Sequence, residues 1–194
     1  MKVLYLYCHP VPESFHAAIR IAALEGLAQG GHEVDLCDLY AEGFDPVMRP
    51  EQRRRYQDLS TNQRGVEPYV ARLRAAEAIV LQFPTWCFGA PAMLKGFLDR
   101  VLLPGVSFDM SDTNHIKPLL ANLRLVIGIV TYGRGRLSAI AMGDAPRKLV
   151  TRYLPRSAVV TARAKFHGLY GMNRADEKKR KAFIASMRNA MARL

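Results

Sequence analysis

Short apolar runs recur at intervals along this chain of 194 residues. Most of them are filled by Val, Ile, Leu and aromatic residues without a polar residue at every second position. Such continuous runs are typical of strands that are buried on both faces of a sheet. The strands predicted in this way are Val3–Cys8, Glu33–Asp38, Ala78–Phe83, Leu125–Thr131 and Ser157–Lys165.

The segments between these runs predict helices. Ser14 is placed to cap the first helix, and Gly30-Gly31 ends it. Pro68 and Pro91 suit the first turns of two later helices. The predicted helices are Phe15–Gln29, Glu51–Leu59, 68–75, 91–101, Ala145–Tyr153 and Ala175–Leu194, and 102–122 is predicted as a long loop.

Strands and helices alternate five times, which predicts an α/β domain over residues 1–194, with a parallel sheet between two layers of helices. Right-handed crossovers leave few arrangements of such a sheet. Five strands favour the flavodoxin-like order 2-1-3-4-5 over a six-stranded dinucleotide-binding fold. Ligands of these sheets bind at the carboxyl ends of the strands. The predicted site therefore comprises the loops His9–His16, Pro84–Ala90 and Thr131–Arg136.

The first of these loops joins a buried strand to a helix, so its backbone N–H groups and the helix dipole form an anion site. Ser14 adds a hydroxyl donor where a phosphate would rest, although the same residue can serve simply as the helix cap. The loop has neither the glycine fingerprint of dinucleotide binding nor the P-loop pattern. The residues of this loop by themselves therefore leave both roles of Ser14 open, with the simple helix cap favoured over the phosphate ligand.

The second loop contains Trp86, the only tryptophan, among Pro, Phe and Gly residues. An aromatic side chain at the carboxyl end of a strand suits the wall of a pocket for a flat ligand. The alternative is a loop that packs its aromatic residues against its own domain. Neither reading needs a catalytic triad or a metal, and the sequence predicts no metal site.

The segment 82–97 resembles the NAD(P)H:quinone oxidoreductases of the flavodoxin-like fold. This group includes the DT-diaphorases and the flavoprotein ancillary subunits of glutathione-gated potassium efflux systems. The resemblance covers roughly residues 1–140. The matching motifs are Gln82-Phe83-Pro84, Phe88-Gly89, Pro91-Ala92, Leu94-Lys95-Gly96, His9-Pro10 with Ser14, Asp38-Leu39-Tyr40 and Phe44-Asp45-Pro46.

The resemblance implies a flavin-dependent NAD(P)H dehydrogenase that passes a hydride, two electrons, to a quinone or a similar small acceptor. The flavin is FMN or FAD, and a chain shorter than the FAD-binding diaphorases favours FMN. The resemblance also implies a homodimer with the substrate pocket at its interface. The implied cofactor-binding residues are His9, Ser14, Phe15, His16, Pro84, Thr85, Trp86, Cys87, Phe88, Thr131, Tyr132 and Gly133.

The chain departs from this family at several positions. His16 stands where Asn is common, and Cys87-Phe88 replaces a Trp-Phe pair. The third loop reads Thr131-Tyr132-Gly133-Arg134 in place of Thr-Thr-Gly-Gly. The Tyr and His that the diaphorases carry downstream of this loop are missing over 137–144, so no catalytic residue is assigned. Tyr132 or Arg134 is a candidate substitute.

Charge is distributed unevenly. The formal net charge is +11, yet residues 1–146 hold 15 basic and 15 acidic side chains, whereas 147–194 hold 13 basic and 2 acidic ones. A nucleic-acid partner would favour aromatic residues interleaved with the basic ones, whereas the last helix keeps its aromatic residue, Phe183, on its apolar stripe. The basic end is either a solvated surface or a site for NAD(P)H or an acidic partner. Arg134 and Arg136 are candidates for binding the 2′-phosphate of NADPH or an acidic substrate, or are solvated loop charges.

The three cysteines, Cys8, Cys37 and Cys87, match no zinc pattern, and their odd number suits a reducing compartment. The amino-terminal run predicts a strand and not a signal peptide, so we expect a cytoplasmic protein. The main hypothesis is the flavin-dependent quinone reductase. The alternative is a flavoprotein that acts chiefly as a regulatory subunit of a membrane transporter, and a binder of nucleic acid or of an anionic surface is a third reading.

Overall fold

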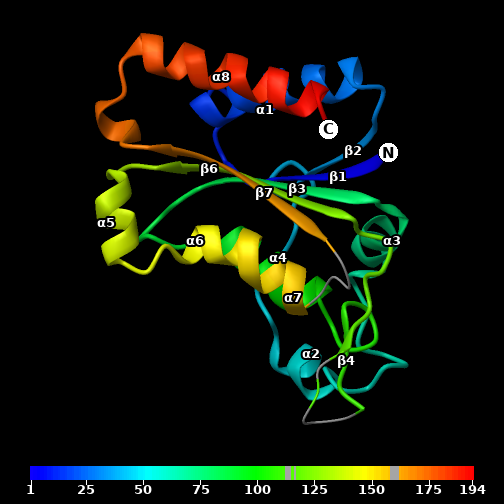
Figure 1. The fold of residues 1–194 in the computed structure, drawn as a ribbon. Coiled ribbons are helices and arrows are strands. Elements are labelled where there is room, and N and C mark those ends of the chain that lie inside the picture. The colour runs from blue at the N-terminus through cyan, green and yellow to red at the C-terminus, as the bar shows by residue number, and fades with distance from the viewer. Residues whose placement is uncertain (112–114, 116, 158–161) are drawn as a thin grey trace.

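A five-stranded parallel sheet forms the centre of the computed structural model, which describes all residues except 112–114, 116 and 158–161. The strands follow the order β2-β1-β3-β6-β7 (Figure 1). β6 and β7 are the fourth and fifth strands of this sheet along the chain, so the predicted order 2-1-3-4-5 is confirmed. The strands are β1 (Lys2–Tyr7), β2 (Glu33–Asp38), β3 (Ala78–Pro84), β6 (Leu125–Tyr132) and β7 (Arg163–Tyr170).

Burial follows the position of each strand in the sheet. Every residue of β3 and of β6 is buried, because these strands have a neighbour on each side and helices on both faces. The edge strands β2 and β7 each have a single buried residue, and their other residues are exposed or half-buried. The apolar runs of the central strands were therefore the clearest signal in the sequence.

Two layers of helices cover the sheet (Figure 1). α1 (Phe15–Gln29) and α8 (Glu177–Ala192) lie on one face, where Gly26 permits their close approach, since a Cβ there would lie 2.2 Å from the carbonyl oxygen of Arg188. On the other face lie α3 (Glu67–Ala75), α4 (Ala92–Val101), α5 (Arg136–Ala141), and α6 (Ala145–Lys148) with α7 (Leu154–Ser157).

The predicted strand Ser157–Lys165 is misplaced. Helical structure continues from α6 through a π-helical turn, Leu149–Tyr153, to Ser157, and β7 then covers Arg163–Tyr170; residues 158–161 lie outside the described residues. The π turn precedes Pro155, which has no N–H to continue the ordinary helical ladder. An edge strand needs no continuous apolar run, and most of β7 has none. The prediction therefore placed the strand on the Val-rich segment that precedes it.

Two further expectations need correction. The charged helix is shorter than predicted, because α2 covers only Pro50–Arg54, and Asp58 then accepts hydrogen bonds in a turn from Ser60 and Thr61. The predicted loop 102–122 contains a small antiparallel pair, β4 (Phe108–Asp109) and β5 (Lys117–Pro118). Within the described part of the chain, no helix is long and apolar enough to cross a membrane.

Candidate functional site

The three predicted loops meet at the carboxyl edge of the sheet and enclose a cavity of about 330 Å³. Nine of its lining residues come from these loops, and two come from the segment after β7. The sequence therefore located the cavity through the general rule for parallel sheets. The lining residues are His9, Ser14, Phe15, His16, Pro84, Thr85, Trp86, Thr131, Gly133, Met172 and Asn173.

The start of α1 supplies hydrogen-bond donors to one end of this cavity. Ser14 caps the helix, and its Oγ accepts a hydrogen bond from the N–H of Ala17 at 3.2 Å. The N–H groups of Phe15 and His16 have no hydrogen-bond acceptor among the described residues. Unpaired N–H groups at the positive end of a helix dipole favour an anion. The cap interpretation of Ser14 thus holds, and the cap leaves the N–H groups of Phe15 and His16 free.

Trp86, which lines the cavity, is the first residue of a tight turn over residues 86–89. The N–H of Trp86 donates to Gly89 O at 3.1 Å, and the N–H of Gly89 donates back to Trp86 O at 2.9 Å. Cys87 and Phe88 between them have φ values of 49° and 58°, a left-handed conformation that costs roughly 1 kcal/mol or more for each residue. This pair of conformations is that of a type I′ turn, in which Asn-Gly is usual.

The strained turn leaves two backbone donors free. The N–H groups of Cys87 and Phe88 make no hydrogen bond within the described chain. In contrast, the N–H of Thr85 donates to Thr131 O at 2.8 Å and so joins the second loop to the third. Neither Cys87 nor Phe88 is among the residues that line the cavity, so these two free N–H groups lie beside it.

Trp86 and His9 bring aromatic surface to the cavity. The Trp86 side chain remains 44% exposed, and its ring lies 6.4 Å from the His9 ring. His9 in turn stacks on His16, with ring centroids 5.3 Å apart. An exposed tryptophan at the mouth of a cavity is an available stacking surface, which agrees with the predicted wall for a flat ligand.

His16 belongs to a buried polar cluster beneath the cavity. Its Nε2 lies 2.7 Å from Thr131 Oγ1, and Gln82 Nε2 lies 2.6 Å from its carbonyl oxygen. Burial, with a smaller effect of His9, lowers the pKa of His16 from its ordinary value to about 3. The imidazole is therefore neutral at physiological pH and offers one donor and one acceptor.

The side chain of Tyr132 does not reach the cavity. Consecutive residues of a strand point to opposite faces, so Thr131 faces α1 while Tyr132 faces the other helical layer. The Tyr132 hydroxyl donates to Asp144 Oδ1 at 2.6 Å, and its ring stacks on Tyr170 at 4.4 Å. Burial and the Asp144 carboxylate raise the pKa of Tyr132. The Tyr132 side chain thus holds the segment after α5 and does not reach the cavity as a substitute for the Tyr that is missing downstream of the third loop.

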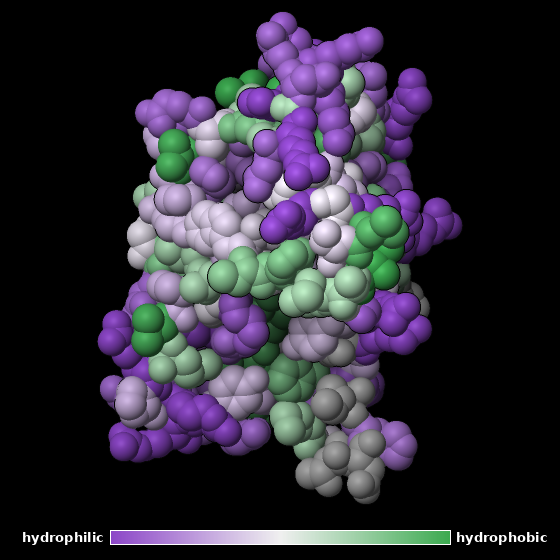
Figure 2. Space-filling model, turned by 90° about the vertical axis from the view of Figure 1, so that its left-hand side faces the viewer, coloured by the Kyte–Doolittle hydropathy of each residue, from purple (hydrophilic) through white to green (hydrophobic). Residues whose placement is uncertain are grey.

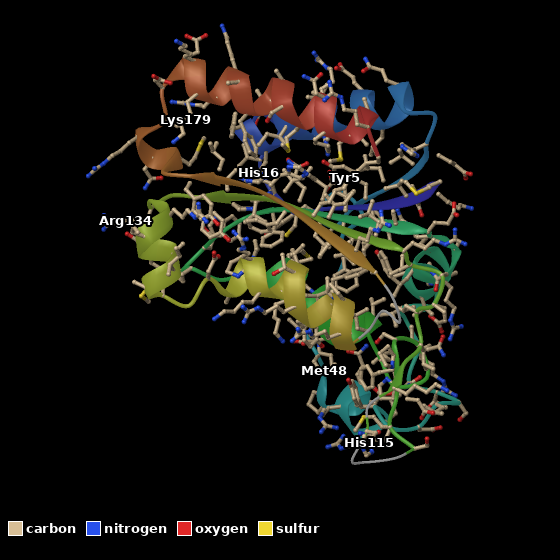
Figure 3. All side chains as sticks on the ribbon, in the orientation of Figure 1. Tyr5, His16, Met48, His115, Arg134 and Lys179 are labelled. Carbon is tan, nitrogen blue, oxygen red and sulfur yellow. The ribbon has the colours of Figure 1, made fainter. Side chains whose placement is uncertain are left out.

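Arg134 and Arg136 are exposed at the start of α5 and lie outside the lining of the cavity. Figure 3 shows Arg134 at this end of α5. Neither side chain forms an ion pair with an acid within the described ranges. The guanidinium groups are therefore available to an anionic group that extends from the cavity.

Sequence reasoning missed Met172 and Asn173, which follow β7 in a short 3-10 turn. The fifth strand was predicted to end at Lys165, whereas β7 ends at Tyr170, so the loop that follows the strand was expected too early in the chain. Gly171, with φ of 74°, marks the turn that starts this segment. Gly133 packs closely against it, because a Cβ there would lie 3.0 Å from Asn173 Oδ1.

Comparison with known proteins places the chain in a family. A family model described as the flavodoxin-like fold matches residues 1–193. The chain belongs to this flavodoxin-like family. The predicted resemblance is confirmed by relatives in rat: the ribosyldihydronicotinamide dehydrogenase [quinone], 32% identical over 146 residues, and NAD(P)H dehydrogenase [quinone] 1, 30% identical over 155 residues.

These matches cover 66% and 72% of this flavodoxin-like chain, but only 63% and 56% of the two rat proteins. The chain thus spans less than two thirds of the length of these relatives. A crystal structure of Smu.1420 from Streptococcus mutans UA159 matches the whole of both chains with a TM-score of 0.86 and 26% identity.

The Lys95-Gly96 motif of the resemblance has a packing role in this flavodoxin-like chain. Gly96 lies on α4 where the helix crosses the segment after β2. A Cβ at Gly96 would lie 2.2 Å from the carbonyl oxygen of Pro46. The Lys95-Gly96 pair therefore identifies a close helix–loop contact and is not part of the cavity.

Proposed function

We propose that the protein is a flavin-dependent oxidoreductase that carries a hydride, two electrons, from NAD(P)H to a quinone or a similar small acceptor. The observation that carries this proposal is one cavity lined by Phe15 and His16, whose backbone N–H groups are unpaired at the start of α1, and by the exposed Trp86. The turn 86–89, where the N–H groups of Cys87 and Phe88 are also unpaired, lies next to this cavity. The names of the rat relatives support the same chemistry.

The donors of the cavity fit a flavin. The N–H groups of Phe15 and His16, with the Ser14 hydroxyl, suit its phosphate, since they lie at the positive end of α1. The N–H groups of Cys87 and Phe88 suit the polar edge of a flat ring, and Trp86 supplies an apolar surface. His9, Pro84, Thr85, Thr131 and Gly133 complete the proposed contacts, and Tyr132 contributes only backbone.

A bound flavin, FMN or FAD, would supply the hydride-accepting and hydride-donating chemistry. The chain's own groups bind and orient it. The free N–H groups of the turn 86–89 also favour negative charge at the ring edge, because they are fixed dipoles that need no reorganisation. Trp86 shields part of the ring from water. Hydride transfer depends on alignment more than on a strong base, so the absence of an assigned acid or base is consistent with this role.

Flavin titration tests the proposed function directly. We expect purified protein to bind FMN or FAD and to show the flavin absorption bands after removal of excess cofactor. The flavin-loaded protein should then oxidise NADPH or NADH steadily in the presence of a soluble quinone. A comparison of NADPH with NADH also tests a role of Arg134 and Arg136 toward the 2′-phosphate. Protein that binds neither flavin would contradict the proposal.

We also propose a homodimer that forms through the face carrying α5. Leu137 and Ile140 on α5 and Met142 after it are exposed at 83%, 55% and 61%. Figure 2 shows this side of the molecule, where hydrophobic side chains form a band with a hollow below it. A trough of about 750 Å³ opens next to α5. Its lining residues are Ala90, Lys95, Met142, Gly143, Ala145, Pro146, Lys148, Leu149, Arg152, Tyr153 and Arg156.

An exposed apolar ridge beside a trough lined by apolar residues and by the stems of Lys95, Lys148, Arg152 and Arg156 can pair with itself across a two-fold axis. We expect Ile140→Asp to convert a dimer into a monomer, because a buried carboxylate at the interface would have no partner. Ile21→Asp is a matched control, since Ile21 on α1 is equally exposed, at 55%. Sedimentation or light scattering measures the mass. A wild-type monomer, or a dimer that survives Ile140→Asp, contradicts this interface.

A regulatory flavoprotein subunit of a membrane transporter is the second candidate. Lys148, Arg152 and Arg156 lie four residues apart along α6–α7, and they form no ion pair with the acids that the structure describes. Such a basic row fits an acidic protein partner. Flavin binding with negligible NAD(P)H turnover would favour this role. Three free cysteines, two of them buried, support the cytoplasmic location proposed for either role.

A further inference from the structure

Four buried polar side chains form a continuous line from the centre of the sheet to the cavity. They are Tyr5 on β1, Gln82 on β3, His16 on α1 and Thr131 on β6, and none is more than 6% exposed. Figure 3 places Tyr5 and His16 together in the layer between α1 and the sheet. Only Thr131 and His16 reach the cavity lining. The line therefore connects the interior to the ligand-facing surface.

The first contacts fix the orientation of the Gln82 amide. The group 2.6 Å from the carbonyl oxygen of His16 must be the NH₂ of Gln82, because a carbonyl oxygen can only accept. The amide oxygen then faces the Tyr5 hydroxyl, which donates to it. The same NH₂ lies 3.2 Å from His16 Nδ1 and carries a second hydrogen for it. Nδ1 of His16 is thus an acceptor.

This orientation decides the tautomer of His16. A neutral imidazole that accepts at Nδ1 carries its proton on Nε2. Nε2 lies 2.7 Å from Thr131 Oγ1, so the ring donates to that oxygen. The Thr131 hydroxyl cannot donate back to a protonated nitrogen. Its Oγ1 has no other hydrogen-bond partner in the part of the chain that the structure describes, and the residue lines the cavity.

We propose that Tyr5, Gln82 and His16 form a one-directional hydrogen-bond relay that turns the hydroxyl proton of Thr131 into the cavity. Thr131 then donates to an accepting oxygen or nitrogen of a bound heteroaromatic ligand. Gln82 and His16 are positioning residues, because they act through Thr131 and not on the ligand. The identity of this ligand as a flavin rests on the proposed function, whereas the direction of the relay follows from the contacts alone.

Two observations distinguish the relay from a structural cluster whose hydrogen bonds only pair buried polar groups with one another. The relay ends at a cavity wall, so its last proton has no protein acceptor among the described residues. Burial also lowers the pKa of His16 to about 3, which keeps the ring neutral and its direction constant across physiological pH. A polar cluster that was only structural would close on itself within the core.

The tautomer of His16 can be read without any ligand. In protein labelled with ¹⁵N at histidine, we expect the His16 spectrum to show a protonated Nε2 and an unprotonated Nδ1, unchanged between pH 8 and pH 5. The His16→Asn variant assigns the signal by removing it. A protonated Nδ1, or a ring that takes up a proton near pH 6.5, would overturn the relay.

Ligand affinity tests the purpose of the relay. We expect Thr131→Val to weaken FMN binding about tenfold and Thr131→Ser to restore it to within about twofold. Gln82→Met alone should weaken FMN binding several-fold. In protein that already carries Thr131→Val, adding Gln82→Met should not weaken FMN binding further. Thr151→Val is the matched control, because the Thr151 hydroxyl donates to Arg147 O, away from the relay and the cavity, and its affinity should stay near that of the wild type.

The outcomes separate the two proposals. Wild-type affinity for FMN in Thr131→Val, or an equal loss from Gln82→Met in both backgrounds, would overturn the relay while the proposed function stands. If the wild-type protein binds neither FMN nor FAD, the proposed function fails, and the His16 spectrum still decides the relay. If Gln82→Met does not fold, the spectrum together with the Thr131→Val and Thr131→Ser pair decides it.

Discussion

FMN binding should be weakened more than a hundredfold by Ser14→Glu. The substitution places a carboxylate at the start of α1, where the Ser14 hydroxyl and the free N–H groups of Phe15 and His16 are proposed to hold the phosphate. Two like charges about 4 Å apart near a protein surface repel by roughly 4 kcal/mol. The variant also loses a charge-assisted hydrogen bond. Quenching of flavin fluorescence measures the dissociation constant.

Three companion variants and measurements sharpen this expectation. Ser14→Ala removes only the hydroxyl and should weaken FMN by roughly 1–2 kcal/mol. Ser186→Glu is the matched control, since it makes the same chemical change at an exposed position on α8 and should leave the affinity unchanged. Circular dichroism checks that α1 keeps its fold. Unchanged FMN affinity in Ser14→Glu would place the phosphate elsewhere.

The folding stability of the wild-type protein should fall as the pH decreases below about 6.5, in part because of His16. Burial holds the pKa of His16 at about 3 in the folded chain, while the unfolded chain titrates near 6.5. Between these values the unfolded state binds more protons, so stability rises with pH and is lost as pH falls. The expected contribution is roughly 1.4 kcal/mol per pH unit, or about 2 kcal/mol between pH 6.5 and pH 5.

The His16→Asn variant isolates this contribution. Asparagine does not titrate, and it is the residue that the family pattern commonly carries at this position. We expect the free energy of unfolding of the wild type, minus that of the variant, to decline from pH 7 to pH 5 and to be constant above pH 7. Urea titrations over that range supply both curves. A flat difference would show that His16 titrates normally and is not held neutral by burial.

The local sequence pattern was sufficient to predict an element wherever the residues of that element alone determine its structure. The continuous apolar runs of β3 and β6 predicted central strands, and both are buried throughout. Ser14 and Gly30 predicted the ends of α1 because caps depend on neighbouring backbone groups. β7 was misplaced for the opposite reason: Arg163 and Lys165 are exposed on an edge strand, whose identity depends on pairing with β6.

The candidate site divides in the same way. The rule that ligands bind at the carboxyl ends of parallel strands located the loops containing Ser14, Trp86 and Thr131, and these loops do line one cavity. The rule could not place Met172 and Asn173, because the strand before them was misplaced. Because side chains alternate along a strand, the sequence already implied that Thr131 and Tyr132 point to opposite faces of the sheet. Which of these faces carries the cavity depends on where α1 packs.

By itself, the sequence determined the order of the five strands in the main sheet, their parallel arrangement and the edge at which the loops converge. These features follow from apolar periodicity and caps, which act over a few residues. Only the tertiary structure decided which backbone N–H groups stay free and how Tyr5, Gln82, His16 and Thr131 are joined. The reason is physical: the direction of a hydrogen bond depends on contacts between residues up to 115 positions apart, which no local pattern encodes.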